Sequence, residues 1–233
     1  MKLSTFHYAR LQDNRLVEEG KEVIFIDRVK VMLVEDDIDW RNGLQSFFSA
    51  ESSFEIISCV DSKEACISAL ADTAVDVVLM DVMLSDPTET GLDATLDITH
   101  NYPGIKVIIV SSLENDDEVF NEAFLSGAYD FVYKNDFEQI PSIIANAMKD
   151  RETKYGPRLK KLVYDKKKQL LNPYDIVLLR LILEGKTQRE IADLNTVSLG
   201  AVKKQVGRLL EKFNWNRSTK ELADKCHKWG LLE

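Results

Sequence analysis

The first part of the chain alternates short apolar runs with longer stretches whose apolar residues have helical spacing. Five runs are rich in β-branched residues and almost continuously apolar, which is typical of strands buried on both faces. These runs are residues 29–34, 54–60, 75–80, 105–110 and 129–133. Five strands that alternate with helical stretches predict an α/β domain of about 120 residues with a doubly wound parallel sheet.

The last part of the chain carries start signals for helices. Residues that favour helix N-termini precede four stretches, and they are Asn172, Thr187, Ser198 and Ser218. Pro173 suits the first turn after Asn172, and Gly185 suits the end of the helix before Thr187. The sequence therefore predicts a small all-α domain after the α/β domain.

The third of these helices has two distinct faces. Its apolar stripe consists of Val202, Val206, Leu209, Leu210 and Phe213. The opposite side carries Lys203, Lys204, Gln205 and Arg208. A short helix, a tight turn and a second helix with a basic outer face predict a helix-turn-helix, which inserts that second helix into the major groove of double-stranded DNA. Lys and Arg can contact guanine or phosphate there, and Gln can pair with adenine.

Composition favours a soluble protein with an ordinary core. The chain has 233 residues, of which 45% are hydrophobic, and only 10 Gly and 5 Pro, so it is not mainly disordered. No apolar run reaches the roughly 18 to 20 residues of a spanning helix, and the N-terminus lacks the apolar core of a signal peptide. The three cysteines show no CxxC spacing, which gives no sign of a disulfide framework or a zinc site. We expect a cytoplasmic protein without a membrane partner.

Charge divides the chain into two unlike halves. Residues 1–150 hold 11 basic and 29 acidic side chains, whereas residues 151–233 hold 19 basic and 10 acidic ones. A basic half on a protein of net charge −9 is the electrostatic pattern of a nucleic-acid-binding surface, although a solvated positive face has the same composition.

Polar residues follow four of the predicted strands. They are Glu35, Asp36 and Asp37 after the first strand, Asp81 after the third, Ser111 after the fourth and Lys134 after the fifth. Because doubly wound sheets bind ligands at the carboxyl ends of their strands, these side chains are candidates for one site. Carboxylates suit Mg²⁺, and Asp81 can form an aspartyl phosphate whose oxygens Lys134 and Ser111 stabilise. Each residue alone also fits a role as a helix cap or turn residue.

Residues 28–150 resemble the receiver domain of bacterial two-component response regulators. The matching segments are VMLVEDD, VVLMDVML, VIIVSS and GAYDFVYK. The resemblance implies a flavodoxin-like five-stranded sheet and a phosphoryl group transferred to Asp81 by a sensor histidine kinase. It also implies Mg²⁺ held by the carboxylates of Asp36 and Asp81 and the backbone carbonyl of Met83, with Glu35 assisting through water.

Two further positions follow from the receiver resemblance. Arg41 lies five residues after Asp36, where receivers often have a basic residue, and this selects Glu35 and Asp36 over Asp36 and Asp37. Phe131 matches the aromatic residue that receivers swing inward when the hydroxyl residue, here Ser111, moves. Core packing is the alternative role for Phe131.

Residues 171–222 resemble the LuxR-type output domain of response regulators. The matching string is LNPYDIVLLRLILEGKTQREIADLNTVSLGAVKKQVGRLLEKF. The resemblance implies that Lys203 and Lys204 reach base edges, with Gln205 and Arg208 nearby. Asn195 stands where a core Leu is usual, so we expect Leu194 to repack into the core.

These observations predict a non-enzymatic, phosphorylation-dependent transcription regulator, a homodimer when phosphorylated, that binds inverted-repeat DNA. The predicted units are an N-terminal extension (1–27), the receiver (28–150), a basic linker (151–168) and the DNA-binding domain (169–233). One alternative is a receiver that acts as a phosphate sink or binds proteins without DNA. Another is a phosphatase with an aspartate nucleophile. Such enzymes usually have a second Asp two residues after the nucleophile, and this chain has Met83 there, which argues against this alternative.

Overall fold

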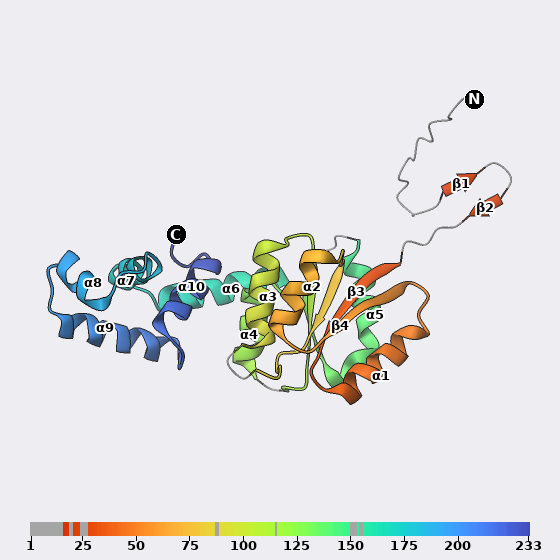
Figure 1. Cartoon of the computed structure of the whole chain (residues 1–233), viewed down its shortest axis with the longest axis horizontal. Helices are drawn as coiled ribbons and strands as arrows, with labels where there is room; N and C mark the ends of the chain where they lie inside the picture. Colours follow the sequence, from red (N-terminus) through yellow and green to blue (C-terminus); the bar gives the residue numbers. More distant parts are fainter. Residues whose placement is uncertain are drawn as a thin grey trace, which may run out of the picture.

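The computed structural model describes residues 16–18, 21–23, 28–86, 89–114, 116–149, 153 and 156–233. Near the N-terminus, β1 (Leu16–Glu18) pairs antiparallel with β2 (Lys21–Val23). The predicted extension 1–27 lies otherwise outside the described residues. The two main parts that follow are an α/β part and a helical part (Figure 1).

The α/β part is built on a parallel sheet of five strands. They are β3 (Val29–Val34), β4 (Phe54–Val60), β5 (Val77–Met80), β6 (Lys106–Ser111) and β7 (Asp130–Tyr133). The strand order is β4-β3-β5-β6-β7, and every neighbouring pair is parallel. The order changes direction beside β3, which places a ligand-binding crevice at the carboxyl ends of β3 and β5. The predicted fold class is confirmed.

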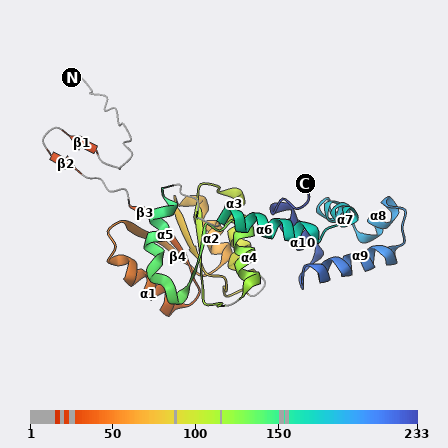
Figure 2. The same ribbon diagram turned by 180° about the vertical axis from the view of Figure 1, so that it is seen from behind.

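Five α-helices and one 3₁₀-helix accompany the sheet. They are α1 (Ile38–Ser49), α2 (Lys63–Asp72), α3 (Gly91–Asn101), α4 (Asp117–Leu125), η1 (Lys134–Gln139) and α5 (Ile140–Ala147). Helices α1 and α5 lie on one face of the sheet, and α2, α3 and α4 lie on the other (Figure 2). Their apolar side chains pack against these two faces. The strands are therefore buried on both faces, as their continuous apolar character predicts.

The helical part consists of α6 (Gly156–Gln169), α7 (Pro173–Leu183), α8 (Gln188–Leu194), α9 (Leu199–Lys212) and α10 (Thr219–Lys228). All four predicted N-caps are confirmed, because the side chains of Asn172, Thr187, Ser198 and Ser218 each accept a hydrogen bond from a backbone N–H of the first turn. The helices share one apolar cluster, which also includes Leu96 of α3 and Leu125 of α4. The helical part thus packs directly on the α/β part.

Most of the predicted basic linker lies in α6, and Pro157 is in the first turn of this helix, where a proline costs no hydrogen bond. One local expectation needs correction. Leu194 is 61% exposed, so the prediction that it repacks into the core is wrong. The buried residues of α8 are Ile191 and Ala192, so the face of this helix that packs on the core does not include Leu194.

No helix in the described part of the chain is both long and apolar enough to cross a membrane.

Candidate functional site

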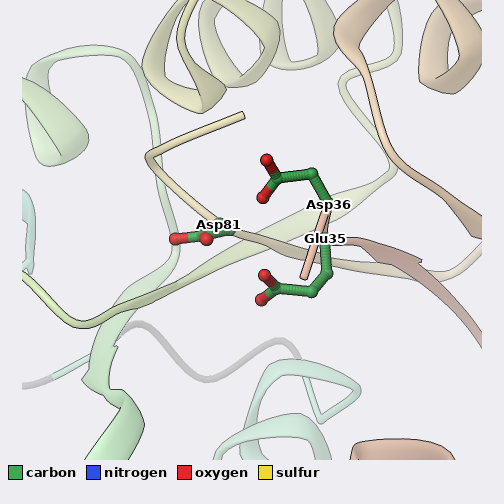
Figure 3. A group of neighbouring side chains, drawn as sticks. All are labelled: Glu35, Asp36 and Asp81. Carbon is green, nitrogen blue, oxygen red and sulfur yellow. The ribbon is translucent and has the colours of Figure 1, made fainter. Parts of the chain in front are cut away.

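Three carboxylates meet where β3 and β5 end. Glu35 and Asp36 follow β3, Asp81 follows β5, and one oxygen of each lies within 4.8 Å of the others (Figure 3). Glu35 is only 1% exposed and Asp81 only 5% exposed. Like charges so close together and so poorly solvated repel one another, unless a cation offsets them.

Lys134 supplies one such positive charge from the end of β7. Its Nζ lies 2.7 Å from Oε2 of Glu35 and 2.9 Å from Oδ2 of Asp81. Burial alone would lower the pKa of Lys134, but its hydrogen bonds and charge interactions with both carboxylates raise it. The ammonium group therefore stays charged at neutral pH.

Burial and repulsion act most strongly on Glu35. Its burial, together with the charge of Asp81, raises its pKa to about 7, even though Lys134 and the N–H of Asp37 oppose this rise. Three carboxylates lie close together, and the ammonium group of Lys134 pairs with two of them, Glu35 and Asp81, so the site is short of positive charge. Oxygen-only donors with a deficit of positive charge fit a hard cation such as Mg²⁺.

Backbone and side-chain donors orient the three carboxylates. The N–H of Val82 donates to Oδ1 of Asp81 at 2.7 Å, and the N–H of Asp37 donates to Oε1 of Glu35 at 3.2 Å. Ser85 Oγ donates to Oδ2 of Asp36 at 3.3 Å. Ser85, a residue that the sequence analysis did not single out, thus connects the loop after β5 to the acid after β3.

The third acid of the sequence cluster, Asp37, has a different role. Its side chain caps α1 by accepting hydrogen bonds from the backbone N–H groups of Asp39 and Trp40 at 2.9 and 3.1 Å. Nη1 of Arg41 donates to the backbone carbonyl of Glu35 at 3.3 Å. Glu35 and Asp36 are therefore the members of the acidic run that lie beside Asp81.

Ser111 lies on β6, the strand next to β5, and Phe131 lies on β7, the strand beyond β6. Ser111 is fully buried at the end of β6, and its Oγ accepts a hydrogen bond from the N–H of Leu113 at 3.1 Å. Phe131 of β7 is half-buried, and its ring centroid lies 5.2 Å from that of Phe120 on α4. Met83, in the loop after Asp81, has an exposed side chain.

Two residues that the sequence analysis missed support the site. The ring of Trp40 lies 5.3 Å from Nζ of Lys134, a cation–π contact that neither residue's sequence neighbours could have indicated. Gly91 begins α3, and a Cβ built on it would lie 1.7 Å from the backbone oxygen of Asp81. Only glycine allows this approach, and its position at the end of the LSDPTETG loop was the available signal.

The predicted DNA-contacting residues all lie on α9. Lys203, Lys204 and Arg208 are exposed. Gln205 is half-buried, and its Nε2 donates to Oδ1 of Asp175 on α7 at 3.4 Å. The structure thus presents three cations together on the outer surface of α9 and holds the fourth candidate against α7.

Comparison with known proteins agrees with this arrangement. Residues 31–145 match the response regulator receiver domain. The chain is 22% identical to the transcriptional regulatory protein DegU of Brevibacillus brevis, covering 85% of this chain and 93% of DegU. It is 27% identical to the response regulator protein VraR of Staphylococcus epidermidis, covering 79% and 90% of the two chains.

Among solved structures, RcsB from Salmonella enterica serovar Typhimurium bound to promoter rprA has a similar fold. The TM-score is 0.52 at 16% identity, covering 84% of this chain and 99% of RcsB. The fold, the strand-end site and the matched relatives define a class of proteins. The chain contains the receiver domain of the response regulators (31–145), followed by a LuxR-type output domain that contains α7 to α10.

Proposed function

We propose that this protein is a cytoplasmic transcription regulator of a bacterial two-component system, which accepts a phosphoryl group on Asp81 and binds double-stranded DNA through α9. One observation carries the phosphoryl part. The buried carboxylate of Asp81 faces an ammonium group at the carboxyl ends of a parallel sheet, beside two further acids. Such an arrangement can bind a phosphoryl group and stabilise its oxygens.

In the proposed transfer, an oxygen of Asp81 attacks the phosphorus of a phosphohistidine on the sensor kinase. A P–O bond forms, the P–N bond breaks and the imidazole leaves. Lys134, which now pairs with Oδ2 of Asp81, would move its ammonium group to a phosphoryl oxygen. The hydroxyl of Ser111 would donate to another phosphoryl oxygen.

The carboxylates of Asp36 and Asp81 and the backbone carbonyl of Met83 would hold Mg²⁺, with Glu35 assisting through water. The ion would supply positive charge that offsets the developing phosphoryl oxyanions. The support on this chain is the all-oxygen donor set and the raised pKa of Glu35, which burial and the charge of Asp81 cause.

The DNA-binding part rests on α9 and on the charge of the C-terminal half. Lys203 and Lys204 would reach base edges, with Arg208 and Gln205 nearby, and a phosphorylated homodimer would place two such helices on an inverted repeat. The relative DegU is described as a transcriptional regulatory protein, which agrees with this role.

Incubation with acetyl phosphate and Mg²⁺ tests the phosphoacceptor. We expect the intact mass of the protein to rise by one phosphoryl group, and we expect Asp81→Asn to abolish the rise because the amide cannot form the acyl phosphate. Asp76→Asn, which changes an acid outside the cluster, is the matched control and should keep the added mass. Uptake by Asp81→Asn equal to that of the control would overturn the assignment.

A further inference from the structure

An aromatic ring lies beside the ammonium group of Lys134. The ring centroid of Trp40 is 5.3 Å from Nζ of Lys134. The same Nζ lies 2.7 Å from Glu35 and 2.9 Å from Asp81, and the side chain of the lysine is only 15% exposed. An ammonium group that has lost most of its water is attracted to the negative face of an aromatic ring. The ring therefore replaces water beside the cation that pairs with Asp81.

The start of α1 fixes where this ring lies. Trp40 is in the first turn of the helix, and its backbone N–H donates to Oδ1 of the N-cap residue Asp37 at 3.1 Å. Asp37 directly follows the two acids of the site, and its own N–H donates to Oε1 of Glu35 at 3.2 Å. The same turn of the chain thus places both the acids and the ring.

The indole ring also packs on the element that carries the lysine. Phe137 lies three residues after Lys134 in η1, and it contacts Trp40 edge to face, with ring centroids 5.9 Å apart and an interplanar angle of 89°. Trp40 therefore touches two residues of one short 3₁₀-helix. This double contact leaves the ring little freedom to turn away from the ammonium group.

The indole N–H indicates that the face of the ring is the useful part of this side chain. In the part of the chain that the structure describes, Nε1 of Trp40 is the buried side-chain polar atom that has no hydrogen-bond partner. A buried donor without an acceptor is unfavourable, and native structures rarely contain one. Apolar packing alone does not require such a donor, because phenylalanine lacks it. Tryptophan does offer the strongest attraction to a cation of the aromatic side chains.

Cation–π attraction suits a lysine that has to change partners. An ammonium group has three N–H donors, and here Glu35 and Asp81 pair with the group from two directions. A third carboxylate would compete with a phosphoryl oxygen for the remaining donor. A ring attracts the charge without a lone pair, so the ammonium group can shift toward a phosphoryl oxygen while it stays beside the ring.

We propose that Trp40 is a positioning residue for phosphoryl transfer, which holds the ammonium group of Lys134 beside Asp81 through the face of its ring. This inference rests on the proposed function of Asp81. Without the ring, water would reach the ammonium group, and the group would spend less time where it can stabilise the phosphoryl oxygens. Phosphorylation would then be slower, although all the reacting groups are still present.

The rate at which the full chain gains one phosphoryl mass from acetyl phosphate and Mg²⁺ tests the proposal. We expect Trp40→Leu to lower this rate about three- to tenfold, because it removes a poorly solvated cation–π contact. Trp40→Phe keeps an aromatic face and should have a rate between those of the wild-type protein and Trp40→Leu. The matched control is Phe47→Leu, which removes another aromatic ring of α1 that packs on Phe137 and should keep the wild-type rate.

Fluorinated tryptophans, incorporated at position 40 alone, separate positioning from packing. They keep the shape of the ring and weaken the negative charge of its face, so they also serve if Trp40→Leu does not fold. We expect the rate to fall stepwise from tryptophan to monofluoro- and difluorotryptophan, with no change in the urea midpoint of unfolding. Equal rates for these three rings, or equal rates for Trp40→Leu and Phe47→Leu, would overturn the proposal. If the wild-type protein gains no phosphoryl mass at all, the proposed function fails, which is a different result from unchanged rates.

Discussion

At the scale of single residues, the site is organised by a shortage of positive charge. Lys134 contacts both buried carboxylates, and its ammonium group is further placed by the ring of Trp40. A phosphoryl group on Asp81 would add more negative charge and three acceptor oxygens. Because Lys134 is already paired with Asp81, a short displacement of its ammonium group would suffice to contact a phosphoryl oxygen.

The buried thiols of Cys66 and Cys226 give a prediction about reactivity. Burial raises the pKa of each thiol to about 12, and for Cys226 the nearby Lys167 and Lys225 offset only part of this rise. At pH 8 about one such thiol in ten thousand is a thiolate, which is the reactive form. We expect both residues to resist iodoacetamide in the native protein and to be alkylated in urea, as read by peptide mass spectrometry.

Cys59 is the internal comparison for the labelling experiment, because its thiol is only half-buried. Burial raises its pKa as well, but Arg41 and Gln45 oppose the rise. Cys59 should therefore be alkylated first in the native protein. Alkylation of Cys66 or Cys226 as fast as that of Cys59 would contradict the burial of these side chains.

At the scale of elements, the start of α3 has no room for a side chain at Gly91. Gly91→Ala would place a methyl group against the backbone oxygen of Asp81, and backbone cannot move aside as a flexible side chain can. We expect the free energy of unfolding to fall by about 1–3 kcal/mol, as for other overpacked sites. Urea unfolding followed by circular dichroism measures this change.

Gly43→Ala is the matched control for Gly91→Ala. Gly43 lies inside α1, and a Cβ there would meet nothing within 4 Å. Alanine should stabilise this helix by about 0.5–1 kcal/mol, because it loses less conformational freedom on folding. If both variants shift the urea midpoint of unfolding in the same direction, the close approach to the backbone of Asp81 is not the reason why position 91 requires glycine.

The elements themselves were largely predictable from the sequence. The five strands of the α/β part are short and mostly apolar, so their type and approximate positions followed from local pattern, and their alternation with helices indicated a parallel sheet. The pairing of β1 with β2 was not predicted. Caps such as Asn172 and Thr187 precede their helices directly, and a local signal of this kind needs no tertiary information. Leu194 was mispredicted because the short helix α8 packs through Ile191 and Ala192, and the pattern of so short a helix does not fix which of its apolar residues face the core.

The candidate site could be predicted from the sequence, whereas the interdomain contact could not. Carboxyl ends of parallel strands meet at one edge, so Glu35, Asp81 and Lys134 could be grouped from topology alone. The ion pair between Asp93 and Lys225 joins residues of two separately folded parts. Nothing in either local sequence indicates the partner, because docking depends on the shapes of both surfaces.

At the scale of the whole molecule, the basic residues of the C-terminal half are divided between two surfaces of the output domain. On one side of the output domain, Arg217, Lys225 and Lys228 pair with acids of the receiver. On α9, Lys203 and Lys204 are exposed. The acidic receiver thus engages one set of cations, while a second set faces solvent. The chain can therefore hold its domains together and keep a basic surface for DNA at the same time.

The exposed lysines of α9 give the last prediction. Lys203→Ala with Lys204→Ala should weaken binding of the phosphorylated protein to a duplex that it selects from a random pool, by tenfold or more. Loss of a phosphate contact lowers the slope of log affinity against log salt by about 0.9 per contact. Loss of a base contact costs about 1–3 kcal/mol and leaves that slope unchanged. Fluorescence anisotropy at several salt concentrations therefore shows whether this pair of lysines contacts phosphates or bases.

Lys30→Ala with Lys149→Ala is the matched control, because it removes the same charge from exposed positions of the receiver. If the long-range field of the protein alone attracted DNA, both double variants would weaken binding equally. If α9 lies in the groove, only the Lys203 and Lys204 variant loses affinity in the way described. Equal losses would therefore show that the basic face of α9 is an ordinary solvated surface and would remove the assignment of α9 as the recognition helix.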